Sequence, residues 1–253
     1  ITRLSEDSIL VGYGSSRYEA DKVEINGSVR RCTQRSVRLY DVAHQSNSTI
    51  VVSRDQRKIR FYSAKDWSHI TDKTISNDTG SSFPYLTVSS ENEIIVANRN
   101  DRIHIFDPTG STRKHSIATM ETPGQALATK SGVIISSSCH YNPPSRVRVY
   151  DRDGKSGDPI AAKEEEYLYP AVDGEDRVFI ASVNQPAGRI QITLYRPEGL
   201  KLKKVVEFEE LELTLSNTWC YLVSVSCDTL AFACGKKVYF LTIPPGIVPL
   251  AAE

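Results

Sequence analysis

Short apolar runs separated by polar turns recur along the whole chain. Each unit has an apolar run, a polar loop, a basic residue and then a second run in which apolar and polar residues alternate. Six copies are recognisable, with equivalent points at Ile9, Ile50, Ile94, Ile134, Phe179 and Ala231. These points are 41, 44, 40, 45 and 52 residues apart. A repeat of about 40 to 50 residues has the length of a four-stranded propeller blade.

The runs have the period of strands rather than of helices. Ile103 and Ile105 alternate with His104, as expected where successive side chains point to opposite faces of a strand. No stretch of ten residues carries apolar positions at helical spacing. Four segments with the Pro, Asp and Gly chemistry of tight reversals lie between the runs: Asp107–Gly110, Asp151–Gly154, Arg196–Gly199 and Pro244–Gly246.

The repeat and its period together predict the fold. We expect an all-β structure, a six-bladed β-propeller with about four antiparallel strands in each blade. A single domain covers residues 1–253 in this interpretation, and its blades start near residues 1, 36, 81, 121, 167 and 214. Closing the strands into a ring would also remove exposed sheet edges.

One segment resembles a known repeat family. Phe83–Ser111, with the sequence FPYLTVSSENEIIVANRNDRIHIFDPTGS, is similar to an NHL repeat almost position by position. The resemblance covers residues 36–200 well, and the first and last units match only in spacing and strand pattern. It implies a six-bladed propeller, often found at the C-terminus of tripartite-motif proteins, that binds protein or RNA. The propeller itself is expected to be monomeric, with oligomerisation left to modules preceding Ile1.

Charge and composition exclude several classes of protein. Lys plus Arg and Asp plus Glu both number 31, so no net charge draws the chain to nucleic acid or to a membrane. Hydrophobic residues make up 40% of the chain and charged residues 25%, which is typical of a folded domain. No apolar stretch is long enough for a membrane helix. We therefore expect a non-membrane protein.

The five cysteines favour a reducing compartment. Cys32, Cys139, Cys220, Cys227 and Cys234 are odd in number, and none forms a C-x-x-C pair. We expect no intramolecular disulfide and a cytoplasmic location.

Enzymatic interpretations find little support in the residues. Some NHL-type relatives are metal-dependent lyases, but the five histidines of this chain include no pair with the spacing of metal ligands. His104 alternates with isoleucines in a strand and is expected to be structural. Lactonase-type propellers need converging Glu, Asn and Asp residues, and no such set stands out. We therefore predict no enzyme activity, no metal and no cofactor, and keep a metal-dependent lyase or lactonase as the minor alternative.

The distribution of charge between the two ends of the predicted ring suggests a binding face. In a blade with strands a to d, the b-to-c turn lies at one end and the a-to-b turn at the other. With Lys and Arg counted as +1 and Asp and Glu as −1, the b-to-c segments sum to +7 and the a-to-b segments to −6. The second sum includes Glu91, Glu93, Asp173 and Asp176. A structural role is the alternative explanation for three of the basic residues, because each directly precedes a strand: Arg102, Arg146 and Arg189.

The basic end is the predicted binding face. Its candidate residues combine cations with polar and aromatic side chains: Arg17, Tyr18, Arg54, Arg57, Lys58, Arg99, Asn100, His140, Tyr141, Lys236 and Lys237. Such a surface suits a protein or peptide partner, with aromatic residues as anchors. It equally has the composition used for single-stranded RNA, where cations contact phosphates and bases stack on rings. Both alternatives describe a binding module.

Overall fold

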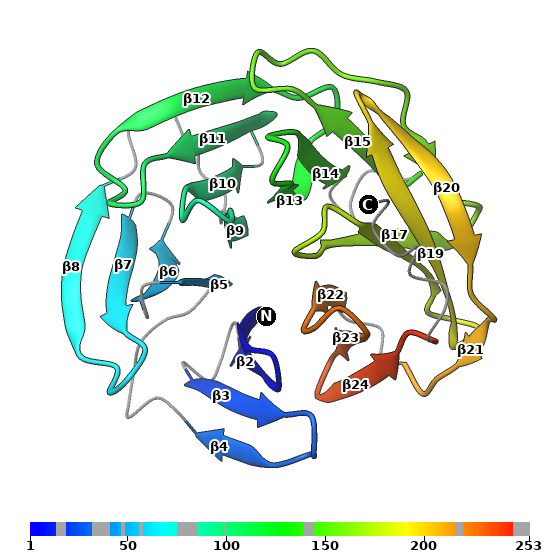
Figure 1. Ribbon diagram of the computed structural model, residues 1–253, viewed down its shortest axis with the longest axis horizontal. Coiled ribbons are helices and arrows are strands. Elements are labelled where there is room, and N and C mark those ends of the chain that lie inside the picture. Colours follow the sequence, from blue (N-terminus) through cyan, green and yellow to red (C-terminus); the bar gives the residue numbers. More distant parts are fainter. Residues whose placement is uncertain are drawn as a thin grey trace, which may run out of the picture.

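The computed structural model describes residues 1–13, 19–31, 41–46, 49–55, 58–74, 85–98, 100–138, 144–215 and 220–244. In these ranges every helix or strand element is a β-strand, and the strands form six antiparallel sheets arranged in a ring (Figure 1). The prediction of an all-β, six-bladed propeller is therefore confirmed. The described ranges contain no helix that is long and apolar enough to cross a membrane.

Blades 1 to 3 each have four strands, which are ordered from the centre of the ring outward. Blade 1 consists of β1 (Thr2–Ser5), β2 (Ser8–Tyr13), β3 (Glu19–Glu24) and β4 (Val29–Arg31). Blade 2 consists of β5 (Asp41–Gln45), β6 (Thr49–Asp55), β7 (Lys58–Ser63) and β8 (His69–Thr74). Blade 3 consists of β9 (Tyr85–Val88), β10 (Ile94–Asn98), β11 (Arg102–Phe106) and β12 (Arg113–Ala118).

Blades 4 to 6 differ more from one another. Blade 4 consists of β13 (Pro123–Ala128), β14 (Ile134–Ser138), β15 (Arg146–Tyr150) and a short β16 (Ile160–Ala161). Blade 5 consists of β17 (Glu166–Val172), β18 (Val178–Asn184), β19 (Arg189–Glu198) and β20 (Lys201–Glu207), and β21 (Leu211–Glu212) also pairs with β19. Blade 6 has three strands in the described ranges, β22 (Cys220–Ser224), β23 (Thr229–Cys234) and β24 (Lys237–Thr242).

The ring closes by side-chain packing between its first and last blades. The innermost strand of blade 6, β22, contacts both β17 of blade 5 and β1 of blade 1. Ile9, Val11 and Val23 of blade 1 form one buried cluster with Val225 and Ala231 of blade 6. Because both blades contribute apolar side chains to this cluster, their separation would expose a core to water.

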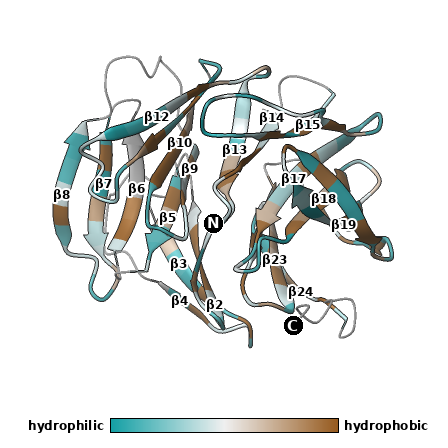
Figure 2. Ribbon diagram, turned by 45° about the horizontal axis from the view of Figure 1, so that its top comes forward, coloured by the Kyte–Doolittle hydropathy of each residue, from teal (hydrophilic) through white to brown (hydrophobic). Residues whose placement is uncertain are grey.

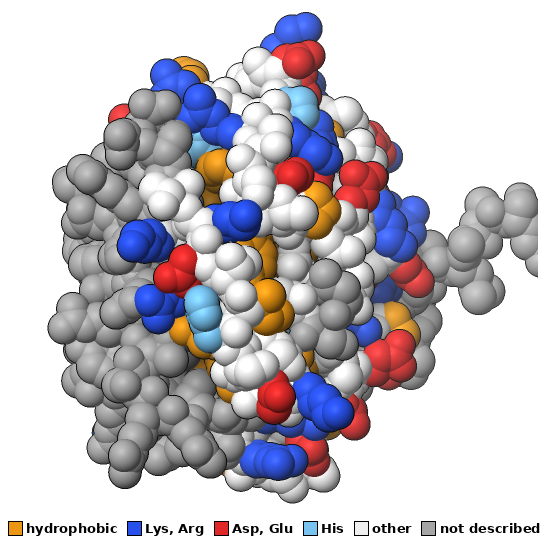
Figure 3. All heavy atoms as spheres, turned by 90° about the vertical axis from the view of Figure 1, so that its left-hand side faces the viewer, with side chains coloured by type: hydrophobic (Ala, Val, Ile, Leu, Met, Phe, Trp, Pro, Cys, Tyr) orange, Lys and Arg blue, Asp and Glu red, His pale blue; other side chains and the backbone are white. Residues whose placement is uncertain are grey.

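Apolar side chains concentrate on the inner strands and between blades, while the outer strands are more polar (Figure 2). The cluster between blades 2 and 3 includes Val51, Ile59, Ile94 and Val96. His104 is fully buried in β11, which is consistent with the expected structural role. On the outer side of the ring near β8, cationic and anionic side chains are interspersed (Figure 3).

Two of the predicted turns join third strands to fourth strands, and a third one is displaced. Asp107–Gly110 and Asp151–Gly154 lie between such strands. Gly110 has φ +67, and a Cβ there would come within 2.8 Å of Ile59 Cδ1, so glycine lets this turn pack against blade 2. In blade 5 the prediction of a turn at Arg196–Gly199 was wrong in position. Strand β19 continues to Glu198, because Pro197 pairs with Leu202 of β20, and the chain reverses at Gly199.

Candidate functional site

The antiparallel order of the strands puts the turns of every blade at two ends of the ring. The first-to-second and third-to-fourth turns lie at one end, which we call the channel-mouth face. The second-to-third turns lie at the other end, which we call the b-to-c face. The face predicted to bind is the b-to-c face, and the two faces differ in how their charged groups are used.

Four of the predicted binding residues have described side chains, and all four belong to second-to-third turns or their borders. Lys58 begins β7 and is exposed, and Asn100 is half-buried in the turn before β11. Lys236 and Lys237 are exposed in the hairpin between β23 and β24. The structure thus brings cations from blades 2 and 6 to the same face. Of the other candidates, the backbone of Arg54 is described in β6 but not its side chain, and six lie outside the described residues: Arg17, Tyr18, Arg57, Arg99, His140 and Tyr141.

The arginines that precede third strands engage neighbouring outer strands and loops. Arg146 Nη1 lies 3.5 Å from a carboxylate oxygen of Glu121, and Arg189 Nη1 lies 3.6 Å from Glu210. Arg102 Nη1 donates to the hydroxyl of Ser116 in β12 at 3.4 Å. These contacts support the structural explanation for the three arginines.

A cavity of about 600 Å³ runs along the axis of the ring and reaches the channel-mouth face. Its walls are the innermost strands, and its mouth is formed by first-to-second turns that include Glu6, Ser89, Lys130 and Asp173. His44 lines the wall, and burial lowers the pKa of its imidazole. It is therefore neutral at pH 7. The described residues contain no group of three or more His, Cys, Asp or Glu side chains placed to hold a metal ion.

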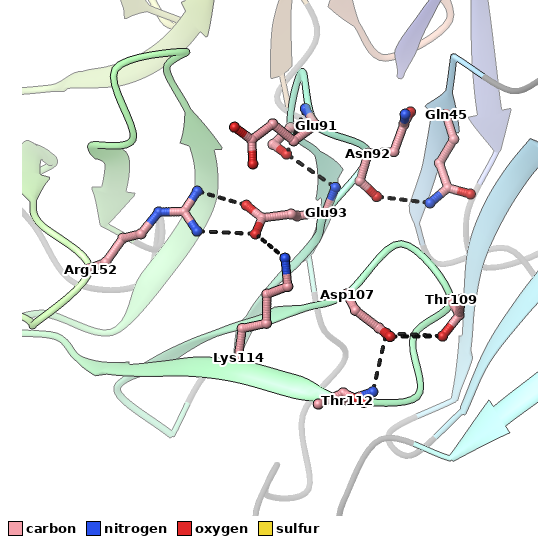
Figure 4. Close-up of polar contacts among 10 residues, drawn as sticks. Gln45, Glu91, Asn92, Glu93, Asp107, Thr109, Thr112, Lys114 and Arg152 are labelled. Atoms are coloured by element: carbon pink, nitrogen blue, oxygen red, sulfur yellow. Dashed lines mark hydrogen bonds and ion pairs between the residues drawn. The ribbon is translucent and has the colours of Figure 1, made fainter.

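The carboxylate of Glu93 is the centre of an ionic network on the channel-mouth face (Figure 4). Only 2% of its side chain is exposed. Arg152 donates to both carboxylate oxygens, at 3.1 and 2.7 Å, and Lys114 Nζ donates at 3.0 Å. These hydrogen bonds, that of Arg152 first, hold the pKa of Glu93 below its usual range. Because Lys114 comes from β12 and Arg152 from the turn after β15, the network ties blade 3 to blade 4.

Neutral hydrogen bonds tie blade 3 to blade 2 on its other side. Gln45 Nε2, at the end of β5, donates to the carbonyl oxygen of Asn92 at 2.9 Å (Figure 4). It also donates to the carbonyl oxygen of Pro108 at 2.9 Å. The backbone N–H of Ser46 donates to Asn92 Oδ1 at 2.7 Å. Asn92 has φ +63, a conformation that asparagine tolerates better than most residues. The amide side chains therefore hold the turns of the two blades together.

Blade 5 is tied in the same way to both of its neighbours. Arg177 is buried and donates to Asp173 Oδ2 at 2.5 Å and to the carbonyl oxygen of Cys227 in blade 6 at 2.6 Å. The carboxylate of Asp176 accepts hydrogen bonds from the backbone N–H groups of Lys130 and Ser131 in blade 4. Arg177 and Asp176 thus join blade 5 to blades 6 and 4.

These contacts change the interpretation of the acidic face. The sequence count of −6 treated the channel-mouth face as a free negative surface, but Glu93, Asp173 and Asp176 are engaged by internal donors. The count left out the third-to-fourth turns, which lie on the same face and bring Arg152, with Lys114 of β12 beside it, to Glu93. Other carboxylates in that count have exposed side chains: Glu6, Asp7, Glu91, Glu175 and Asp228.

The cysteines of blade 6 lie in two environments. Cys220 and Cys234 are buried directly opposite each other on β22 and β23, and Cys227 is exposed in the turn between these strands. All three are thiols, while Cys32 and Cys139 lie outside the described residues. The neighbouring Cys234 and burial raise the pKa of the Cys220 thiol. Cys220 is therefore a protonated thiol of low reactivity toward electrophiles at neutral pH.

Solved propellers are similar to this chain in fold. A chain in the crystal structure of the mitotic checkpoint complex matches with a TM-score of 0.63 at 12% identity, over 96% of this chain and 86% of that chain. The C-terminal WD40 domain of Sif2 matches with a TM-score of 0.59 at 9% identity, over 94% of this chain and 78% of that chain. No family model and no curated protein matches the sequence. The similarity shows the propeller fold, and assignment to the NHL type stays a prediction.

Proposed function

We propose that this propeller is a non-enzymatic interaction module that binds a protein or peptide partner on its b-to-c face. The observation that carries the proposal is the contrast between the two faces. On the channel-mouth face, Glu93, Asp173 and Asp176 are bound by donors from their own or neighbouring blades. On the b-to-c face, Lys236 is exposed in a turn and Lys58 is exposed at the border of one. One face stiffens the ring, and the other presents side chains to a ligand.

The partner proposal also agrees with the architecture. A ring whose blades are tied together is a rigid scaffold, and a rigid scaffold loses less ordering entropy on binding. Binding sites are commonly carried by loops on such a scaffold. In this proposal Tyr18 and Tyr141 are the anchors, and the lysines and arginines around them guide the partner's orientation and association.

Single-stranded RNA on the same face is the second candidate. The exposed Lys58, Lys236 and Lys237 are placed on one side of the ring, as a surface that follows a phosphate backbone requires. The two candidates differ in which residues carry the binding energy. RNA binding would depend mainly on the cations and fall steeply with salt, whereas protein binding would depend mainly on the tyrosines.

The test is a charge reversal on each face. Replacing Arg54, Arg57, Arg99 and Lys236 by Glu should abolish binding without unfolding the ring, because these are proposed loop tips, where a substitution usually changes stability by about 0.5 kcal/mol or less. The matched control replaces four exposed lysines at the channel-mouth end by Glu: Lys65, Lys130, Lys155 and Lys201. Binding is measured by affinity purification from extract with quantitation of each bound protein, and by anisotropy of labelled single-stranded RNA.

The outcomes separate the candidates. For RNA, losing four cations should reduce the slope of log affinity against log salt by about three, from about 0.7 per phosphate contact. For a protein partner, replacing Tyr18 and Tyr141 by Ala should weaken binding more than the charge reversal does. If the charge-reversed protein and the control bind the same partners with equal affinity, the b-to-c face is not the binding site.

A further inference from the structure

Among the described residues, no strand covers the third strand of blade 6. Each of the other five blades has a fourth strand outside the third, whereas β24 is the outermost strand of blade 6 in the part of the chain that the structure describes. The four apolar side chains of β24, Val238–Leu241, are each only half-buried. In the corresponding strand of blade 3, Ile103–Phe106 are all buried. Apolar residues on an uncovered strand indicate a surface that is completed by another segment.

The pairing of β24 with β23 fixes which of its backbone groups face outward. Gly235 and Lys236 form a two-residue hairpin turn with Cys234 opposite Lys237. In a hairpin of this length the closing pair exchanges both hydrogen bonds, so residue 237 and every second residue after it turn toward β23. The N–H of Ile243 donates to the carbonyl oxygen of Asp228 at 2.7 Å and keeps this alternation.

The other residues of β24 therefore turn their backbone hydrogen-bonding groups toward the open edge. Val238, Phe240 and Thr242 direct their N–H and C=O groups away from β23, in the spacing that a further antiparallel or parallel strand would meet. An extended peptide that pairs with this edge would gain backbone hydrogen bonds and would become the fourth strand of the blade.

An apolar groove lies beside the open edge. It has a volume of about 370 Å³ and runs between the outer end of blade 5 and the outer part of blade 6. Ile192, Phe208 and Leu211 line it from blade 5, and Leu230, Leu241 and Ile243 line it from blade 6. Leu211 is 36% exposed. Where a strand added to β24 passes Leu241 and Thr242, its side chains on the blade 5 side would point toward this groove. Pockets for alternate side chains give strand addition its specificity.

The border of the groove is acidic. Glu207 and Glu209 both line it, and both are exposed. Glu207 is paired with Lys204, while Glu209 has no ion pair within the described ranges. The border therefore favours a ligand with a positive charge next to its apolar residues.

We propose that the edge of β24 and this groove bind an extended peptide segment of a protein partner, with alternating apolar side chains and a flanking Lys or Arg. Charge complementarity selects this occupant over residues 245–253 of the same chain. Those residues include Ile247, Val248 and Leu250 but no Lys or Arg, and they carry Glu253. The groove lies beside Leu241 and Thr242, at the end of β24 away from Lys236 and Lys237 of the b-to-c face, so the partner would be held by a second surface.

The probe for this proposal is a labelled synthetic peptide of alternating Val and Thr residues with a Lys at each end. Binding to the full 253-residue chain is followed by fluorescence anisotropy. Leu241→Lys adds a charge to the groove, and Thr242→Pro removes an outward N–H from an edge position where proline is tolerated. The matched control is Ile70→Lys, because Ile70 is 55% exposed on β8, the outer strand of a four-stranded blade.

We expect saturable binding that weakens at least tenfold in Leu241→Lys and in Thr242→Pro and is unchanged in Ile70→Lys. Replacing the terminal lysines of the peptide by Glu should weaken binding as well, and so should methylation of alternate peptide nitrogens. Circular dichroism checks that each variant is folded. The Lys58→Glu variant, which is changed on the b-to-c face, should bind the peptide as the parent does. The two proposed sites are therefore tested separately, and a negative result on the b-to-c face would not affect the result at β24.

Three results would overturn the proposal. The first is no saturable binding, or binding that both groove variants leave unchanged. The second is binding that emerges only after Ile247→Lys with Leu250→Lys, which would show that the chain's own residues occupy the edge. The third is a concentration-dependent dimer that Leu241→Lys dissociates while the peptide does not bind, which would identify a second copy as the occupant.

Discussion

Blades 3 and 6 have the same repeat and the same pairing of second and third strands, yet they differ in what their outer edge provides. In blade 3, β12 covers β11 and carries Lys114, which reaches Glu93. In blade 6, β24 has no such cover in the described ranges, and its apolar residues are half-buried. A fourth strand thus contributes burial for the third strand and, in blade 3, a charge partner for the turns.

The difference has a consequence for stability that runs along the ring. Blade 3 is tied to blade 2 through Gln45 and to blade 4 through Arg152. Blade 6 is held to blade 5 by the hydrogen bond from Arg177 to Cys227 and by apolar contacts around Phe179 and Phe232. We therefore expect the outer part of blade 6 to open locally at a lower free energy than blade 3, since local stability follows the density of buried contacts.

The largest effect is expected from matched truncations of the two third strands. Ile103 and Val238 both lie opposite an alanine of the second strand, Ala97 and Ala233 respectively. Ile103 is 0% exposed, so Ile103→Ala should lower the free energy of unfolding by about 3 kcal/mol. Val238 is half-buried, so Val238→Ala should cost about 1 kcal/mol or less. Urea unfolding measures both, and equal losses would contradict the contrast between the blades.

A somewhat smaller effect is expected at the ionic network of blade 3. Glu93→Gln leaves Arg152 and Lys114 without their carboxylate, and we expect a loss of about 2 kcal/mol in the free energy of unfolding, because both cations remain partly exposed to water. Glu91→Gln is the control, since Glu91 is exposed two residues away, and should change stability by about 0.5 kcal/mol or less. If the network contributes little to stability, the two variants should lose the same free energy of unfolding.

The same network predicts a pH dependence. Arg152 and Lys114 hold the pKa of Glu93 below its usual value of 4.5, so the folded state binds that proton less readily than the unfolded state. The stabilisation is present above the unfolded pKa and is lost as the pH falls through the folded pKa. Between pH 7 and pH 3, the parent should therefore lose more stability than Glu93→Gln does. Parallel acid limbs in urea unfolding would show that Glu93 is not the group responsible.

The smallest perturbation is chemical labelling of the blade 6 thiols. Cys227 is exposed, whereas Cys220 and Cys234 are buried, and the pKa of Cys220 is raised. A maleimide should modify Cys227 in the native protein at pH 7 and reach Cys220 and Cys234 only on unfolding, as peptide mass spectrometry would show. Rapid native labelling of Cys220 would mean that β22 and β23 separate more readily than their packing indicates.

The sequence predicted the architecture because each blade repeats a local pattern. The equivalent points at Ile50, Ile94 and Ile134 lie in or at the start of second strands, and their spacing sets the number of blades. The displaced turn in blade 5 shows a limit of this approach. Pro197 and Gly199 are typical turn residues, but pairing of β19 with β20 through Pro197 outweighed that local preference.

Counting charges along the sequence could not predict the ionic network of Glu93, because the network joins residues that are close only after folding. Lys114 and Arg152 lie 21 and 59 residues from Glu93 in sequence. A face-by-face sum that includes the third-to-fourth turns would have brought them together. The sequence predicted the open edge of blade 6 less well. The repeat spacing predicts a blade there, but the half-burial of Phe240 and Leu241 is visible only in the folded structure.

Native-state hydrogen exchange resolved by NMR tests the open edge of blade 6 most directly. In β24, the amides of Val238, Phe240 and Thr242 should exchange much faster than those of Tyr239 and Leu241, which face β23. In β11, which is paired on both sides, the amides of Ile103, His104 and Ile105 should all be protected. Uniform protection along β24, equal to that of β11, would contradict an open edge.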